Sequence, residues 1–215
     1  MEVDYLESIV TAIDEGETEQ VAELTQKALD EGIPAKELME RGLVRGMEKV
    51  GEKFKEGVAY LPEILIAARA ANRGLEVLKP AITKSGVKPK GKVVIGTIEG
   101  DLHDIGKNMV KFVLQGNGFE VIDLGVDVSA AQFHQAVVEE KPDMVAISAL
   151  LTTTMVNIPS VLETLGKTGL RGGVKIMVGG ASLTEEYAQE VGVDAYGEDC
   201  FQAVEIARRF MGVTS

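Results

Sequence analysis

The stretch K-V-V-I-G-T-I-E-G-D-L-H-D-I-G-K, from Lys92 to Lys107, decides the fold of this chain. It opens on a short β-branched run, residues 92–97, which predicts a strand. A polar loop follows, and residues with helical spacing begin near Ile105. A strand, a loop and a helix in direct succession form the repeating unit of parallel sheets. We therefore expect an α/β fold.

The remainder of the C-terminal half repeats this unit. Five strands alternating with helices predict a doubly wound, five-stranded parallel sheet of Rossmann or flavodoxin type. Ligands bind such sheets beyond the carboxyl ends of the strands. The further strands are expected at 119–124, 143–148, 174–180 and, weakly, 194–196, with helices at 105–114, 130–139 and the C-terminal end. The candidate site is therefore formed by residues 97–106, 125, 148–154, 179–180 and 196–197.

The N-terminal half has a helical pattern. Apolar residues recur at helical spacing in four stretches between Leu6 and Leu78. Gly16 and Gly32 end the first two stretches, and Pro62 falls where the fourth begins, at the first helical position, which tolerates proline. Four helices with short connections predict an antiparallel four-helix bundle.

A linker separates the two halves. Residues 85–91, S-G-V-K-P-K-G, contain glycine and proline, which break a helical pattern. We expect a helical bundle domain at 1–88 and an α/β domain at 89–215.

Bulk composition argues against several classes of function. The formal charge is −12 at pH 7, shared as −5 by residues 1–88 (12 basic, 17 acidic) and −7 by residues 89–215 (10 basic, 17 acidic). Acidic charge spread this evenly disfavours nucleic acid and anionic membranes as partners. No apolar run reaches the length of a membrane span, and the N-terminus lacks a signal-peptide pattern. The single cysteine, Cys200, cannot form an internal disulfide, so we expect a cytoplasmic protein.

The loop after the first strand contains the residues with chemical potential. Residues 100–107 match neither the dinucleotide fingerprint nor the Walker phosphate loop. They place Asp101 two residues before His103 at the carboxyl end of a strand. A carboxylate bonded to one ring nitrogen fixes the tautomer and leaves the other nitrogen free to bind a metal. By itself, Asp-x-His is a common pair, for which a polar loop histidine is the ordinary explanation.

Two further elements follow this loop at fixed distances. The pattern D-x-H-x-x-G ends at Gly106, and the 41 residues 107–147 separate it from S-A-L at Ser148–Leu150. Another 28 residues, 151–178, lead to Gly179–Gly180. With these gaps the chain resembles the cobalamin-binding fold that methionine synthase shares with the corrinoid proteins of methyltransferase systems.

The resemblance extends to the helical half. Residues 56–63, E-G-V-A-Y-L-P-E, are similar to a turn in the helical cap of those proteins. The family pattern implies that the bundle covers the upper, reactive face of the corrin ring. Tyr60 and Leu61 would then contact the corrin or shield its methyl group.

The resemblance also implies roles for the residues that match its motifs. His103 would replace the cofactor's own base as the lower ligand of the cobalt, Asp101 would bond its far nitrogen, and Thr154 would complete the relay with a hydroxyl. Other cofactor contacts are glycines beside the nucleotide tail (Gly106, Gly179, Gly180), hydroxyls toward it (Ser148, Thr152) and an apolar wall (Leu150). The remaining expected contacts are Gly100, Leu102, Asp104, Ile105, Tyr196 and Gly197.

The resemblance implies that the chain is a corrinoid methyl carrier. Such a carrier holds the methyl group but needs partner enzymes to transfer it. Cobalamin or a related corrinoid is the expected cofactor, as methylcobalamin in the loaded state. The expected partners are a substrate-specific methyltransferase, an acceptor methyltransferase that uses tetrahydrofolate or coenzyme M, and a reductive activase. His103 would bind cobalt in the methylated state and release it in the reduced state. The bundle would move aside at each transfer, with a hinge at residues 85–91.

Other interpretations share the D-x-H-x-x-G pattern. A B12-dependent mutase subunit would meet a barrel over the cofactor, whereas this chain has only the helical cap. A cobalamin-dependent sensor or regulator would need a DNA-binding module and typically a tryptophan-bearing helical domain, and the sequence contains no Trp. A free-standing fragment of methionine synthase would itself be a carrier. The methyl donor stays open among methylamines, methanol, aryl methyl ethers and quaternary amines such as betaine.

Overall fold

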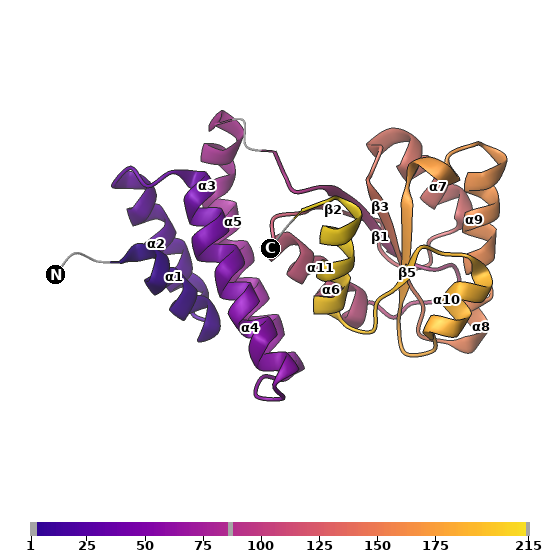
Figure 1. The fold of residues 1–215 in the computed structure, drawn as a ribbon, viewed down its shortest axis with the longest axis horizontal. Helices are drawn as coiled ribbons and strands as arrows, with labels where there is room; N and C mark the ends of the chain where they lie inside the picture. The colour runs from indigo at the N-terminus through magenta and orange to yellow at the C-terminus, as the bar shows by residue number, and fades with distance from the viewer. Residues whose placement is uncertain (1–3, 86–87, 214–215) are drawn as a thin grey trace. The chain divides into compact units, whose positions relative to one another are not determined.

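A computed structural model describes residues 4–85 and 88–213. The chain forms two compact units (Figure 1). One comprises the residues up to Pro89 together with Gln115–Gly118, and the other comprises Lys90–Leu114 and the residues from Phe119 onward. The expected hinge at 85–91 includes Gly86 and Val87, which lie outside the described residues.

The first unit is a helical bundle, as its apolar spacing predicts. Asp4 begins the first helix because its carboxylate accepts a hydrogen bond from the Glu7 backbone N–H at 3.2 Å. The helical segments are α1 (Tyr5–Asp14), α2 (Thr18–Asp30), α3 (Ala35–Glu37), the π-helical η1 (Leu38–Val44), α4 (Arg45–Lys55) and α5 (Leu61–Ser85). Segments α3, η1 and α4 follow one another without a break and form one continuous helical rod. With α1, α2 and α5, the described residues of this unit therefore form four helical rods.

The third rod is not the regular α-helix that the spacing predicts, because η1 inserts a π-helical stretch into it. Its glycines serve packing. A β-carbon at Gly46 would lie 2.8 Å from Cδ1 of Ile13, and one at Gly42 would lie 3.3 Å from Cγ2 of Ile9. The two glycines therefore let this rod approach α1 closely.

Helix α5 differs from the prediction at both ends. It begins at Leu61, so Pro62 is its second residue rather than its first. Both positions lie in the first turn, where backbone N–H groups have no partner within the helix. The Glu63 carboxylate accepts from the Tyr60 N–H at 3.1 Å and helps to begin the helix. The helix then continues through Pro80 to Ser85, the first residue of the expected linker.

The second unit confirms the predicted parallel sheet. Its order is β2-β1-β3-β4-β5 with every neighbouring pair parallel, which is the flavodoxin order. The strands are β1 (Lys92–Thr97), β2 (Glu120–Asp123), β3 (Met144–Ser148), β4 (Lys175–Gly179) and β5 (Ala195–Tyr196). The helices are α6 (Ile105–Gly116), α7 (Ala130–Glu140), α8 (Thr152–Met155), α9 (Ile158–Lys167), the 3₁₀ turn η2 (Arg171–Gly173), α10 (Glu185–Val191) and α11 (Cys200–Phe210).

Helices cover both faces of this sheet. Figure 1 shows α6 and α11 on one side and α7, α9 and α10 on the other. On the second side, buried Phe133, Val161 and Ala188 pack with the strand residues Val145 and Ile176 in one apolar core. Coverage of both faces explains why the central strands read as continuous apolar runs.

The sheet order also fixes where the site lies. The chain leaves β1 to form β2 on one side and then returns to form β3 on the other side. Thr97 and Ser148, the last residues of β1 and β3, are register partners. The loops that follow them therefore emerge side by side at the switch point of the sheet, where ligands bind in this architecture. No described helix is long and apolar enough to cross a membrane.

Candidate functional site

The loop after β1 is shaped by a tight turn. The N–H of Asp101 donates to the carbonyl of Ile98 at 3.0 Å, closing a four-residue turn. Gly100 has φ +83°, the left-handed conformation that a type II turn needs at its third residue and that glycine adopts without strain. The hydroxyl of Thr97 then donates to the carbonyl of His103 at 2.9 Å. These bonds fix the loop backbone from both ends of the Asp101–His103 segment.

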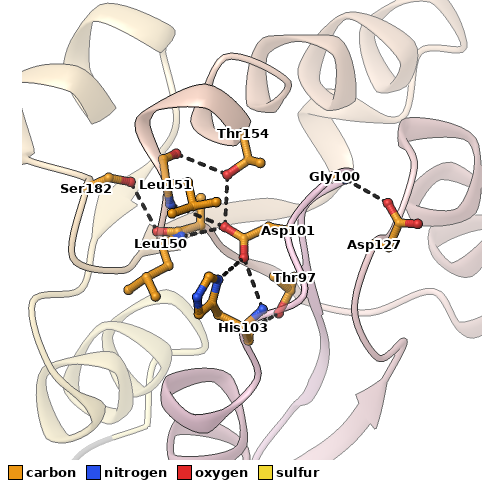
Figure 2. Close-up of polar contacts among 10 residues, drawn as sticks. Thr97, Gly100, Asp101, His103, Asp127, Leu150, Leu151, Thr154 and Ser182 are labelled. Carbon is orange, nitrogen blue, oxygen red and sulfur yellow. Dashed lines mark hydrogen bonds and ion pairs between the residues drawn. The ribbon is translucent and has the colours of Figure 1, made fainter.

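The side chain of Asp101 is fully buried and lies at the centre of a hydrogen-bond network (Figure 2). Its Oδ1 accepts from the backbone N–H of His103 at 3.0 Å and from Nδ1 of the same residue at 2.7 Å. Its Oδ2 accepts from the N–H of Leu150 at 2.8 Å, the N–H of Leu151 at 3.3 Å and the hydroxyl of Thr154 at 2.9 Å. Both oxygens are therefore satisfied by donors from the two adjacent loops.

This environment keeps Asp101 ionised. Burial by itself would raise the pKa of the Asp101 carboxyl group, because a charged group loses water there. The hydrogen bonds from Leu150, from the backbone and ring of His103, and from Thr154 outweigh burial and lower that pKa well below its ordinary value. Asp101 is therefore an acceptor only.

The hydroxyl of Thr154 has one hydrogen and two acceptors within reach. Its oxygen lies 2.9 Å from Oδ2 of Asp101 and 3.0 Å from the carbonyl oxygen of Leu151. A hydrogen bond to a charged acceptor is the stronger of the two. Thr154 itself is buried, within the short helix α8. The structure thus brings together Asp101, His103 and Thr154, the three residues of the expected relay.

The ionised carboxylate determines the tautomer of His103. Because Asp101 only accepts, the hydrogen between them belongs to Nδ1 of His103, and in this tautomer Nε2 keeps its lone pair. The His103 side chain is 51% exposed. Within the described residues, Nε2 of His103 has no hydrogen-bond partner, so this nitrogen is available to bind a ligand.

The protein offers one such nitrogen rather than a complete metal site. Within residues 4–85 and 88–213, no group of three or more His, Cys, Asp or Glu side chains could hold a metal ion. A metal bound at Nε2 of His103 would therefore need most of its ligands from elsewhere, as a metal held in a macrocycle has. The donor set fits a corrinoid cobalt with one protein ligand.

The surface around His103 fits the apolar faces and edges of such a ring. Leu102 is 72% exposed, Ile105 78% and Leu150 38%, although large apolar side chains usually avoid water. Gly106 is exposed on α6, and a β-carbon there would meet nothing within 4 Å. Neither backbone conformation nor packing in the described residues requires glycine there, so the open space suits a bound group. Asp104 and Thr152 are also exposed at this edge.

Gly179 and Gly180 have a different reason to be glycine from the expected closeness to a nucleotide tail. A β-carbon at Gly180, where φ is +134°, would overlap the carbonyl of Ala149. One at Gly179 would lie 2.8 Å from the carbonyl oxygen of Gly197. The two glycines let the β4 loop approach its neighbouring loops, which already explains them within the protein.

The remaining expected contacts lie in different settings. Ser148 is half-buried at the end of β3, and Tyr196 packs against the apolar core at the end of β5. Tyr60 and Leu61 are 64% and 55% exposed, at the start of α5 in the helical unit. Their contact with a corrinoid stays a prediction.

The sequence analysis did not foresee three contributions to the site: the backbone role of Leu151, which lies inside the expected range 148–154, and the residues Asp127 and Lys107. Leu151 supplies a backbone N–H to Asp101, and Asp127 bonds the Gly100 turn, as Figure 2 shows. The buried ammonium of Lys107 lies 2.7 Å from Oδ1 of Asp123, which secures α6 to the end of β2.

Comparison with known proteins agrees with the geometry. Two models of the B12 binding domain match, over residues 91–205 and 5–79. Trimethylamine corrinoid protein 1 of Methanosarcina mazei is 47% identical over 195 residues, 90% of each chain. A corrinoid protein of Desulfitobacterium hafniense is 40% identical over 99% of this chain and 100% of its own. The structure of the methanol:cobalamin methyltransferase complex MtaBC from Methanosarcina barkeri contains a chain with a TM-score of 0.86 and 35% identity, covering 100% of this chain and 82% of that chain.

Proposed function

The chain belongs to the family of B12-binding corrinoid proteins of methyltransferase systems, and we propose that it carries a methyl group on a corrinoid that it holds through His103. The observation that supports this role is the bond between Nδ1 of His103 and the ionised Asp101, which leaves Nε2 exposed as a ligand. When bound, the corrinoid supplies a cobalt atom that accepts a methyl group from one enzyme and yields it to another.

The chain's own residues bind and orient this cofactor. Asp101 keeps the hydrogen on Nδ1 of His103, so that Nε2 points its lone pair outward. Thr154 and the amides of Leu150 and Leu151 hold the carboxylate in place. The exposed apolar side chains of Leu102, Ile105 and Leu150 provide contact area for the ring.

The partners follow from this role. A substrate-specific methyltransferase loads the methyl group, and an acceptor methyltransferase removes it; a reductive activase restores cobalt that has been oxidised. For the donor we propose a methylated amine. The trimethylamine corrinoid protein is 47% identical to this chain, whereas the methanol-system chain is 35% identical.

The division into a bundle at 1–88 and a cofactor domain at 89–215 forms part of the proposal, with Tyr60 and Leu61 facing the reactive side of the corrin.

A cytoplasmic location also forms part of the proposal. Cys200 is buried, and its burial raises the pKa of the thiol to about 12, which suits a structural cysteine rather than a disulfide partner. Fractionation of cells that express the native gene would test the location.

The experiment that tests the function is a methyl-loading assay. The full chain, reconstituted with cobalamin and reduced to the cob(I) state, is mixed with the trimethylamine or the methanol methyltransferase and its substrate. We expect the visible spectrum to change to that of a methylated corrinoid with trimethylamine. His103→Ala should lose the axial-nitrogen spectrum. Absence of loading with either enzyme would contradict the proposed function, and loading with methanol alone would contradict the proposed donor.

A further inference from the structure

Asp127, in the segment between β2 and α7, bonds the His103 loop at two points. Its carboxylate oxygen Oδ1 accepts from the N–H of Gly100 at 2.7 Å, and its own N–H donates to the carbonyl of Asp101 at 3.0 Å. Figure 2 shows the side chain of Asp127 directed at the Gly100 turn. We propose that Asp127 is a positioning residue, which sets the position and orientation of the His103 ring by holding the turn that precedes His103. The inference rests on the proposed role of His103.

The backbone of Asp127 indicates that this contact constrains the chain. Its φ is +55°, a left-handed conformation that residues other than glycine rarely adopt. Among the described residues only one other non-glycine residue, Lys141 with φ +47°, has a positive φ. Lys141 ends helix α7, where a left-handed residue is common. Asp127 ends no helix, and its conformation is explained by the two bonds to the loop.

The geometry gives Asp127 influence over His103 without contact between them. Asp101 is bonded through its backbone to Asp127 and through its side chain to His103. The carbonyl of His103 is held separately by Thr97. Without the bond to Gly100, the turn loses its outer support, and the backbone that carries Asp101 and His103 is held at fewer points.

Three substitutions separate the hydrogen bond from the backbone conformation. Asp127→Gly keeps the left-handed conformation at no steric cost and removes the carboxylate. Asp127→Asn keeps an oxygen acceptor and tolerates the same conformation. Lys141→Gly is the matched control, because it makes the same change at the other left-handed position, away from the loop.

The readouts do not depend on methyl transfer. In the cofactor-free protein, nitrogen NMR of His103 gives the fraction of ring with the hydrogen on Nδ1. In protein grown with ¹⁵N-histidine and loaded with cob(II)alamin, electron paramagnetic resonance gives the fraction of cobalt with a ¹⁵N ligand. We expect Asp127→Gly to lower the ratio of ligated to unligated cobalt by up to about tenfold, because tenfold is the lower end of the effect of removing a direct partner of a metal-binding histidine, and Asp127 acts one bond further out. It should also lower the Nδ1–H fraction.

The outcomes distinguish this inference from the proposed function. Asp127→Asn should restore both readouts to near the wild-type value, and Lys141→Gly should leave both unchanged. If the wild-type protein shows no ¹⁵N ligand, the role of His103 is wrong. If the wild-type protein shows that ligand and Asp127→Gly retains it at the wild-type ratio, or if Lys141→Gly lowers it equally, Asp127 is not a positioning residue.

Discussion

The hydroxyl oxygen of Thr154 lies 2.9 Å from Oδ2 of Asp101, although 53 positions separate the two residues in the chain. Both are buried, so the bond forms away from water and supports the charge of the carboxylate. The loops after β1 and β3 meet at this bond. The sequence predicts both residues, but only the folded sheet brings them together.

We expect Thr154→Ser to preserve this bond and Thr154→Val to abolish it. Valine has nearly the same shape but cannot donate, so Asp101 loses one of its donors. The free energy of unfolding of Thr154→Val should fall by about 1.5–3 kcal/mol, the usual cost of removing a hydrogen bond to a charged group. Urea unfolding of the two variants and the wild-type protein measures this difference. Equal stability of the valine and serine variants would show that the hydroxyl hydrogen bond of Thr154 does not stabilise the fold.

The lowered pKa of Asp101 predicts how stability depends on pH. Because the folded-state pKa lies below the unfolded value of about 3.9, the carboxylate stabilises the fold fully above that pH. This contribution is lost as the pH falls from about 4 through the folded-state pKa, where the unfolded chain binds the proton first. In Asp101→Asn the contribution is absent. Urea unfolding between pH 7 and pH 3 should show the wild-type protein losing stability faster in acid, by up to about 1.4 kcal/mol per pH unit. If the unfolding free energies of the two proteins change with pH in parallel, this prediction is wrong.

Much of the fold could be predicted because its signals are local. The strands β1, β3 and β4 are covered on both faces, so each is a continuous apolar run that the sequence shows directly. The π-helical stretch at Leu38–Val44 could not be predicted, since it has the same apolar spacing as an α-helix. The C-terminal end of α5, at Ser85, could not be predicted either, because a proline such as Pro80 usually indicates a helix boundary.

The site was predictable where its residues are close in sequence or match the family pattern, as Thr154 does six residues after Ser148. Asp101 and His103 are two positions apart, and their pairing needs only a short loop. Asp127 belongs to another loop and acts through a left-handed backbone that the sequence does not reveal. At Gly180, the sequence shows a missing side chain but not the neighbour, the carbonyl of Ala149, that fills the space.

The ion pair between Lys107 and Asp123 should contribute more to the free energy of unfolding than an exposed ion pair does. The Lys107 side chain is only 2% exposed, and its ammonium lies 2.7 Å from Asp123. Asp123→Ala would leave the Lys107 charge buried without this partner, and we expect a loss of about 3–5 kcal/mol in the free energy of unfolding. Lys107→Met removes the buried charge itself and should cost less.

The control for this prediction is the exposed pair of Glu163 and Lys167, whose side chains are 66% and 71% exposed. Glu163→Ala removes a pair at a similar distance, 2.8 Å, in full contact with water. Its effect should stay within about 1 kcal/mol, as is typical of surface pairs. Thermal or urea unfolding of the three variants compares them directly, and a similar loss in Asp123→Ala and Glu163→Ala would show that burial of Lys107 adds nothing.

Two glycines of the site should respond oppositely to alanine, because one is required by the protein and the other leaves room for a bound group. In Gly180→Ala the new β-carbon meets the carbonyl of Ala149 at a backbone conformation unsuited to alanine. We expect a loss of stability on the order of 1–3 kcal/mol even without cofactor. In Gly106→Ala the β-carbon enters open space within α6, where alanine favours the helix by up to about 1 kcal/mol.

Cofactor binding should distinguish Gly106→Ala from the wild-type protein, although the stability of the two proteins does not. Gly106→Ala should fold at least as well as the wild-type protein yet bind hydroxocobalamin more weakly, because its methyl group takes up space that the cofactor occupies. Titration of the cofactor-free proteins with hydroxocobalamin, followed by absorbance, gives the two dissociation constants. If Gly106→Ala binds as tightly as the wild-type protein, the space beside Gly106 does not accommodate the corrinoid, and the absence of a side chain there has no function in binding.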